Sequence, residues 1–276
     1  QYRLSDYEGA FDTFTRLLDF SLEYYKESGK DSNMKPDALE YLAISMIDVA
    51  KNSESFSDPN WRKYSTDPLM SSGQLLAATG YGLNPAGPIQ VFDLWFNKVG
   101  RREYEVEVIK TLAAKLEEAS YAEDAIATYE YIQQKWPTDP ENPDFQYRIS
   151  QLYISGVAVR DDAAADAALA KLGEMYNDDS AWAAANRNNP DALAKAQAYQ
   201  EQSLYSVATG LHARAQQTGS VADYSMAADR YREYLNKFPF ANQYYQTQFY
   251  LAEALFSSQR FEEAIVEYNA LLKVPG

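Results

Sequence analysis

The stretch YSMAADRYREYLNKFP, residues 224–239, is typical of an amphipathic helix that stops at a proline. Tyr231 and Tyr234 follow Ala227 by four and seven positions, and Pro239 follows it by twelve. Offsets of four and seven fall on one face of an α-helix. The small alanine allows a neighbouring helix to approach closely, and the aromatic ring fills the space beside it. The stretch therefore predicts a helix that packs through this face.

The same frame is written elsewhere in the chain. YAEDAIATYEYIQQKWP, residues 121–137, repeats the offsets of four, seven and twelve in full. FEEAIVEYNALLKVPG, which starts at residue 261, has its proline one position early, and YEGAFDTFTRLLDF, which starts at residue 7, lacks the proline. The four alanines that set the frame are Ala10, Ala125, Ala227 and Ala264.

A second pattern lies twelve residues before two of the frame alanines. It reads Leu-Ala-x-x-Leu, at Leu112 to Leu116 and at Leu251 to Leu255, and a weaker form surrounds Ala215. The unit thus consists of two helices joined by a short turn. Ala227 and Ala264 are 37 residues apart, which is a reasonable period for a helical repeat.

In these residues the sequence resembles the tetratricopeptide repeat family, whose repeat has small residues at the helix crossing, an aromatic in its second helix and a late proline. The early aromatic of that family is missing, and alanine takes the place of its glycine. The resemblance implies an all-α fold, a right-handed superhelical solenoid of antiparallel helix pairs with irregular insertions. We expect one such domain over 1–276, with clear repeats at 104–137 and 222–276, degenerate units at 4–50 and 145–219, and an insertion at 53–86.

Further helices are predicted from caps, breakers and alanine content. We expect helices over 35–52, 87–100, 145–156 and 161–177, and one long helix over 190–219. The long helix is predicted to be capped by Asp191 and to end at Gly219. The pairs Asp161-Asp162 and Asp178-Asp179 are interpreted as helix caps.

Charge and composition exclude several classes of partner. The net charge is −15, which repels phosphate backbones, so we expect no nucleic-acid partner. No apolar run approaches the roughly 18 residues that a membrane span needs. There is no cysteine, so disulfides and thiolate metal sites are excluded. Because the chain starts at Gln1 without methionine, we expect an N-terminal segment to have been removed. Residues 4–28 resemble a second helix without its first, and KVPG falls where a unit closes, so we expect the chain to be cut from a longer array.

Catalytic motifs are missing from the sequence. It contains no phosphate-binding glycine loop and no nucleophile elbow. His212 is the only histidine, so it cannot build a triad or a histidine metal site alone. The acidic turn 138–144 lacks the glycine and terminal glutamate of a calcium loop. We therefore predict no enzyme activity, no cofactor and no metal.

The family resemblance places a partner groove on the first helices. Its positions lie three residues before the helix-crossing alanine, one after it, and four or five after it. The residues predicted there are acidic, aromatic or aliphatic for the most part, which would suit a partner segment with basic and apolar side chains. Alternatively, this surface packs against neighbouring repeats. The candidate residues are Glu40, Ile47, Lys110, Glu117, Glu118, Phe249, Glu253 and Phe256.

The leading hypothesis is a non-enzymatic scaffold that binds a partner protein or peptide on its concave face, in an envelope-associated assembly. A second hypothesis is a binding protein for a small ligand or glycan, which uses the insertion and the residues Trp61, Trp95, Trp136 and Trp182. A third is an enzyme whose active site lies in a longer chain. The style of the tyrosine-rich repeats resembles bacterial cell-envelope proteins, which implies a periplasmic or envelope location; a cytoplasmic location is the alternative.

Overall fold

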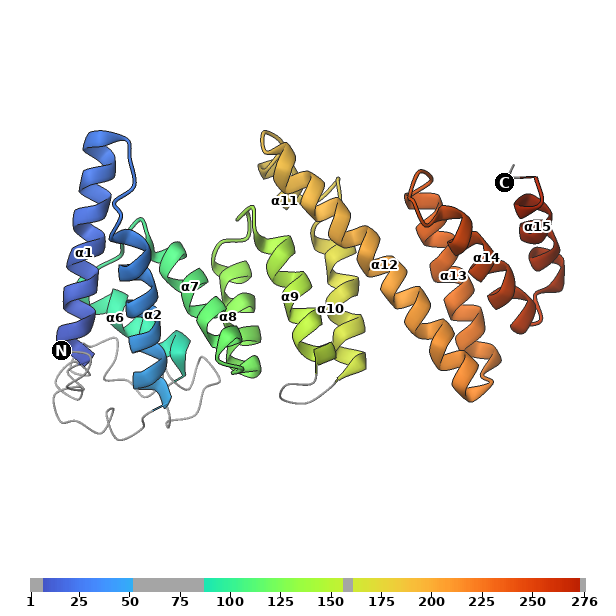
Figure 1. The fold of residues 1–276 in the computed structure, drawn as a ribbon, viewed down its shortest axis with the longest axis horizontal. Helices are drawn as coiled ribbons and strands as arrows, with labels where there is room; N and C mark the ends of the chain where they lie inside the picture. Colours follow the sequence, from blue (N-terminus) through green and yellow to red (C-terminus); the bar gives the residue numbers. More distant parts are fainter. Residues whose placement is uncertain (1–6, 52–86, 156–160, 274–276) are drawn as a thin grey trace. The chain divides into compact units, whose positions relative to one another are not determined.

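The computed structural model describes residues 7–51, 87–155 and 161–273. In these residues every regular element is a helix, which confirms the all-α prediction for this part of the chain (Figure 1). The chain divides into two compact units, Gln1–Trp136 (unit 1) and Pro137–Gly276 (unit 2). The predicted insertion at 53–86, with Trp61, lies outside the described residues, and the single-domain solenoid stays a prediction.

Unit 1 is built around α2 and α7. α1 packs on α2, α2 packs on α7, and α7 packs on α8, while α6 contacts α2, α7 and α8. The described helices of unit 1 are α1 (Tyr7–Ser28), α2 (Lys35–Lys51), α6 (Pro88–Val99), α7 (Glu105–Glu118) and α8 (Ala122–Lys135).

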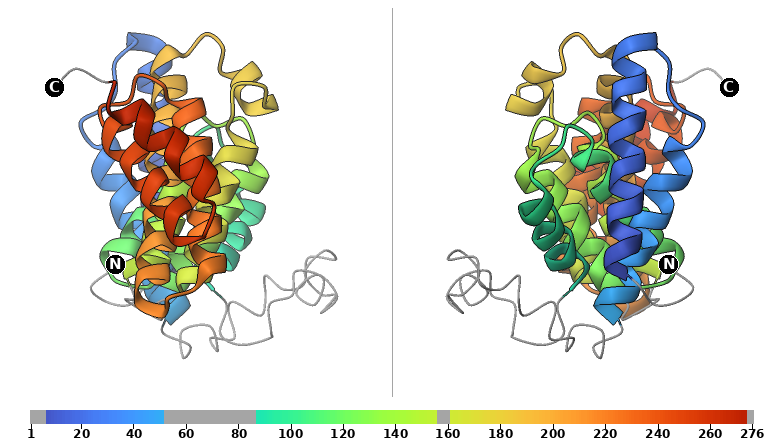
Figure 2. Two further views of the ribbon diagram at one scale, coloured as in Figure 1. Left: turned by 90° about the vertical axis from the view of Figure 1, so that its right-hand side faces the viewer. Right: turned by 90° about the vertical axis from the view of Figure 1, so that its left-hand side faces the viewer.

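Unit 2 begins with a helix pair and continues as a row. α9 packs on α10, the long α12 packs on both, and then α13, α14 and α15 each pack on the helix before (Figures 1 and 2). The described helices of unit 2 are α9 (Asn142–Ser155), α10 (Asp162–Met175), α11 (Ala181–Ala185), α12 (Pro190–Thr218), α13 (Val221–Lys237), α14 (Tyr244–Ser257) and α15 (Phe261–Leu271).

Most of the repeated frame is core, as predicted, but its aromatic side chains Phe14 and Tyr268 are only half-buried. All four frame alanines are buried, and so are Tyr129, Tyr231 and Tyr234. α8 and α13 both end two residues before their frame proline, at Lys135 and Lys237. Ala227, Tyr231 and Tyr234 share one buried cluster with residues of α14, so the frame joins helices that are adjacent in the chain.

Two turns that connect repeated helices have the same backbone conformation. Ser120, between α7 and α8, has φ of 63°, and Gln259, between α14 and α15, has φ of 67°. Each lies five residues before its frame alanine. In both turns the residue after the left-handed one donates its N–H to a leucine carbonyl five residues back, Tyr121 to Leu116 and Arg260 to Leu255, at 2.9 Å in each case. This is the Schellman arrangement, which ends a helix on a left-handed residue.

Helix caps correct two of the predictions. α12 is capped by Asn189, whose side chain accepts from the N–H of Ala192, while Asp191 lies in the first turn. α11 lies in a stretch for which no helix was predicted. It is capped by Ser180 and not by the Asp178-Asp179 pair. In each case a carboxylate near the helix start was mistaken for the cap, although an uncharged polar side chain holds that position. Asp161 caps α10 and the left-handed Gly219 ends α12, as predicted.

α6 is fixed in unit 1 by its tryptophan. Pro88 opens the helix, and the Gln90 side chain accepts from the Gly87 N–H at 2.7 Å. Trp95 is 1% exposed and donates its indole N–H to the hydroxyl of Thr15 on α1 at 2.8 Å. Because this contact joins residues 80 positions apart, α6 closes the core of unit 1 between α1 and the later helices.

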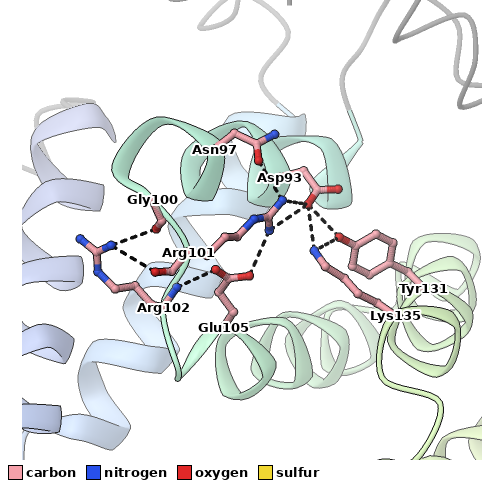
Figure 3. A network of polar contacts seen from close by, with 8 residues as sticks. All are labelled: Asp93, Asn97, Gly100, Arg101, Arg102, Glu105, Tyr131 and Lys135. Atoms are coloured by element: carbon pink, nitrogen blue, oxygen red, sulfur yellow. Dashed lines mark hydrogen bonds and ion pairs between the residues drawn. The ribbon is translucent and has the colours of Figure 1, made fainter. Parts of the chain in front are cut away.

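A polar network joins α6 to α7 and α8 (Figure 3). Asp93 accepts from the Tyr131 hydroxyl at 2.7 Å and from the Lys135 ammonium at 3.2 Å, and the Arg101 guanidinium approaches the same oxygen at 3.4 Å. Arg101 also donates to the buried Glu105 at 3.0 Å. Burial, followed by the hydrogen bond to Asp93, raises the pKa of the Tyr131 hydroxyl. Asp93 is therefore the shared acceptor of three donors from outside its own helix.

Hydrogen bonds from tyrosine hydroxyls to carboxylates recur in both units. Among the described residues, six such bonds each link a helix to another helix or to its N-cap residue, and in five of them the hydroxyl–oxygen distance is 2.6 to 3.0 Å. The pairs are Tyr104–Asp19, Tyr129–Glu117, Tyr131–Asp93, Tyr199–Asp144, Tyr234–Glu201 and Tyr268–Glu253. The tyrosines and carboxylates that are abundant in the sequence thus stabilise the helix contacts together.

Candidate functional site

α14 carries a row of exposed aromatic side chains. Tyr245, Phe249 and Phe256 are spaced by four and seven residues, so they share one face of the helix, and their exposed fractions are 55%, 43% and 58%. Glu253 lies in the same row, four residues after Phe249. We call these four residues the α14 face. The opposite side of α14, which includes Leu251 and Leu255, is buried in unit 2.

The carboxylate of the α14 face is held in place by α15. Glu253 accepts a short hydrogen bond from the hydroxyl of Tyr268. Burial, followed by this hydrogen bond, raises the pKa of Tyr268 to about 12, so the hydroxyl remains a donor at neutral pH. A carboxylate offers about four lone-pair positions, so Glu253 retains the capacity to accept from a further donor.

The rings of the α14 face are oriented by neighbouring aromatic side chains. Phe249 meets Tyr268 edge-on, with ring centroids 6.5 Å apart, and lies 6.3 Å from Tyr250. Phe256 meets Phe261 edge-on at 5.4 Å. These edge-to-face contacts favour defined ring positions, and little rotamer freedom would be lost when a partner covers the face.

In unit 1, the structure brings two of the predicted residues together. Lys115 on α7 contacts Glu40 on α2 at 2.9 Å and Glu118 on its own helix at 2.8 Å. The hydrogen bonds to Glu118 and Glu40 raise the pKa of Lys115. The two carboxylates therefore share one cation, and α2 and α7 are linked at this point.

The other predicted residues of unit 1 differ in their surroundings. Glu117 accepts from the hydroxyl of Tyr129 at 2.6 Å, so it anchors a core tyrosine as well as facing outward. Ile47 is 7% exposed and contributes to packing. Lys110 on α7 is half-buried. Most of the predicted residues on α2 and α7 are therefore paired or at least half-buried. Among the three helices, α14 offers the most exposed predicted side chains.

A cleft in unit 1 provides the place to consider a small ligand. Its volume is about 350 Å³, and its charged walls are already paired, since Lys35 contacts Glu107 at 2.7 Å and Asp31 at 3.4 Å. A ligand would have to replace these ion pairs. The residues that line it are Leu18, Ser21, Leu22, Tyr25, Asp31, Lys35, Glu103, Tyr104 and Glu107.

Two of the tryptophans expected to serve a glycan, Trp95 and Trp182, are packed inside the units. Trp95 and Trp182 are 1% and 3% exposed, and Trp182 donates its indole N–H to the carbonyl of Asp139 at 2.7 Å. Trp136 is half-buried. A buried ring cannot offer a stacking surface to a sugar, so these residues give no support to the glycan hypothesis.

His212 lies inside unit 2. It is 7% exposed, its Nδ1 lies 3.2 Å from the hydroxyl of Tyr231, and the rings of Tyr224 and Tyr250 meet it edge-on. Burial lowers the pKa of His212, while Glu253 acts in the opposite direction. These surroundings give the imidazole a packing role.

The described residues contain no group of three or more histidine, aspartate or glutamate side chains arranged to hold a metal ion. Among the helices of the described ranges, none has the length and apolar character required to cross a membrane. No protein-family model matches the sequence, and no curated protein matches it.

Tyr245 lies outside the predicted groove positions, although the sequence contains a signal for it. It precedes Phe249 by four residues and therefore extends the same helix face. The link between Glu253 and Tyr268 has no comparable signal, because the two residues belong to different helices and their approach depends on how α14 and α15 pack.

Proposed function

We propose that this chain is a non-enzymatic scaffold of tetratricopeptide-like helix pairs, which binds a segment of a partner protein on the α14 face. One observation carries the proposal: three half-exposed aromatic side chains line one side of a packed helix, with a hydrogen-bonded carboxylate in the same row. Aromatic residues are enriched at the energetic centres of protein interfaces.

The chemistry of the partner segment follows from this row. Phe249 and Phe256 offer apolar area, and Tyr245 adds a hydroxyl at one end. Glu253 offers a fixed negative charge among them, so a lysine or arginine of the partner gains a charge-assisted hydrogen bond. The partner segment we propose therefore has a basic residue flanked by apolar ones.

The solenoid part of the proposal rests on repetition. The frame recurs with buried alanines and tyrosines in both units, and the turns at Ser120 and Gln259 share one left-handed conformation. Helices that follow one another in the chain also pack together within each unit. We propose that the repeats form a right-handed superhelix of antiparallel pairs.

Selection of random peptides on the immobilised protein tests the α14 face. Peptides selected from a displayed twelve-residue library should be enriched in basic and apolar residues. They should lose at least about tenfold in affinity towards a Phe249→Ala, Phe256→Ala double variant, because each ring buries a large apolar area on binding. Glu253→Lys should reverse the preference for basic residues.

Glu262→Lys is the matched control, since it makes the same charge change at an exposed glutamate on α15. Peptides that bind the double variant as well as the parent chain would refute the α14 face as the binding surface. Because Glu253→Lys also removes the acceptor of the Tyr268 hydroxyl, Tyr268→Phe, which removes the same hydrogen bond and keeps the carboxylate, is a second control.

We further propose an envelope location, which rests on the resemblance of the tyrosine-rich repeats to bacterial envelope proteins. Fractionation of cells that produce the protein from its own gene tests this: recovery of the protein in the cytosol alone would refute it.

A further inference from the structure

His212 of α12 lies where this helix meets α13 and α14, which follow one another in unit 2 (Figure 1). Three rings meet the imidazole edge-on, those of Tyr224 and Tyr231 of α13 and Tyr250 of α14, with centroid distances of 5.6, 5.7 and 6.0 Å. Nδ1 lies 3.2 Å from the Tyr231 hydroxyl, and Nε2 lies 3.5 Å from the side-chain nitrogen of Gln216. The imidazole is therefore enclosed at a junction of three helices, with a polar neighbour at each nitrogen.

Glu253 of the α14 face acts on this imidazole. It follows Tyr250 by three residues, so it lies one helical turn from the ring that meets His212 and on the same side of α14. Burial lowers the pKa of His212, and the negative charge of Glu253 works against that change. A proton taken up by His212 would therefore place a positive charge within the electrostatic reach of Glu253.

The other ionisable groups around His212 do not change charge between pH 5 and 7. Tyr224, Tyr231 and Tyr250 are neutral phenols in this range. Arg214, two residues further along α12, is paired with Asp223 of α13 at 3.1 Å, so these two charges largely offset each other. The imidazole is thus the group of this junction whose charge responds to mild acid.

We infer that His212 regulates the α14 face, and that uptake of one proton at its imidazole weakens the binding of a basic partner residue to Glu253. The inference rests on the proposed function of this face. The imidazolium and the partner's ammonium or guanidinium group act on the same carboxylate, so each reduces the free energy that the other gains from it. The partner segment is held at neutral pH and released in mild acid.

The coupling is reciprocal. If protonation of His212 weakens partner binding by a given factor, the bound partner weakens protonation by the same factor and lowers the pKa of His212. This gives a readout that needs no substitution. His212 is the only histidine of the chain, so a sample labelled with carbon-13 histidine has one imidazole signal to follow in an NMR titration.

The probe is a peptide selected on the α14 face at pH 7. It contains one arginine, has blocked ends and lacks histidine, aspartate and glutamate, so the peptide itself does not titrate between pH 5 and 7. Fluorescence anisotropy gives its affinity for the whole chain at pH 7 and at the pH where the NMR signal shows His212 to be protonated. We expect a loss of at least about fivefold, the lower end of typical coupling between two sites.

Two matched controls isolate the charge. In His212→Gln, a neutral side chain replaces the imidazole, and the affinity for the arginine peptide should stay within about twofold over the same range of pH. The same peptide with glutamine in place of its arginine binds more weakly at pH 7, and acid should not weaken it further. In the NMR titration, the arginine peptide should lower the pKa of His212 and the glutamine peptide should not. Circular dichroism at each pH confirms that the protein is folded.

Two results would overturn the inference. The first is an equal loss of affinity in acid for the parent chain and for His212→Gln, which would assign the effect to another group. The second is an equal loss for the arginine and glutamine peptides, which would mean that acid loosens the packing of α14. In both cases binding at pH 7 that depends on Phe249 and Phe256 still supports the α14 face. If the selected peptides do not depend on these two rings, the proposed function fails, and the regulation fails with it.

Discussion

Replacement of Asp93 by alanine tests whether the network of Figure 3 stabilises unit 1. The change removes the acceptor of the Tyr131 hydroxyl, 2.7 Å away, and the anion that faces Lys135 and Arg101. A hydrogen bond to a charged group contributes about 1.5–3 kcal/mol. The two ion pairs are partly exposed, so each adds only about 0.2–1 kcal/mol. Together these contributions predict that unit 1 loses about 2–5 kcal/mol of unfolding free energy.

Asp12→Ala is the matched control, because it also removes one carboxylate from unit 1. Its partner Arg16 lies 3.7 Å away on the same helix, and both side chains are more than half exposed. The expected loss is below about 0.5 kcal/mol. The comparison therefore separates the effect of the network from the effect of one negative charge.

Native-state hydrogen exchange read by mass spectrometry is the assay, since the two units need not unfold together. Peptides from α7 and α8 should exchange at least about 30-fold faster in Asp93→Ala, the factor that the lower limit of about 2 kcal/mol implies. Peptides from α13 and α14 should not change. If Asp93→Ala and Asp12→Ala gave equal exchange in α7 and α8, the reasoning about the network would be wrong.

Three further predictions concern the turns and the titratable groups. Ser120→Gly or Gln259→Gly should each raise stability by about 0.5–1 kcal/mol in urea unfolding, because glycine adopts the left-handed conformation without strain. Tyr268, whose pKa is raised to about 12, contributes stability that is present below its unfolded pKa near 10 and lost as pH rises to 12; Tyr268→Phe should flatten the alkaline melting profile in that window. Burial lowers the pKa of His212, so its contribution to stability is complete above the unfolded-state pKa of about 6.5. Below that pH the unfolded state takes up a proton first, and stability falls. His212→Gln should therefore reduce the fall in denaturation midpoint between pH 6.5 and 5.

The repeated core could be read from the sequence because it depends on periodicity. The offsets from Ala125 and Ala227 place a small residue and an aromatic one on a single helix face, and the structure buries both. The cap of α12 could not be read with the same certainty. Asn189 and Asp191 are both good capping residues two positions apart, and only the backbone conformation decides between them.

The candidate site was accessible to sequence reasoning in part. Phe249 and Phe256 lie at predicted groove positions on either side of Ala252, and the structure leaves both exposed. Ile47 lies at an equivalent position but is buried, because burial depends on the neighbouring helices of each unit and not on the frame. Contacts such as Tyr104–Asp19 join residues 85 positions apart and have no local pattern.

The tyrosine–carboxylate pairs have a consequence for the behaviour of the protein in concentrated salt. At 1 M ionic strength the Debye length is about 3 Å, so pairs of opposite charges such as Lys115 and Glu40 are strongly screened. A tyrosine hydroxyl carries no net charge, and its short hydrogen bond to a carboxylate is a local dipolar contact. Concentrated salt should therefore weaken the lysine–carboxylate ion pairs, while the tyrosine–carboxylate hydrogen bonds between helices persist. It should also screen the repulsion among the charges of a chain whose net charge is −15.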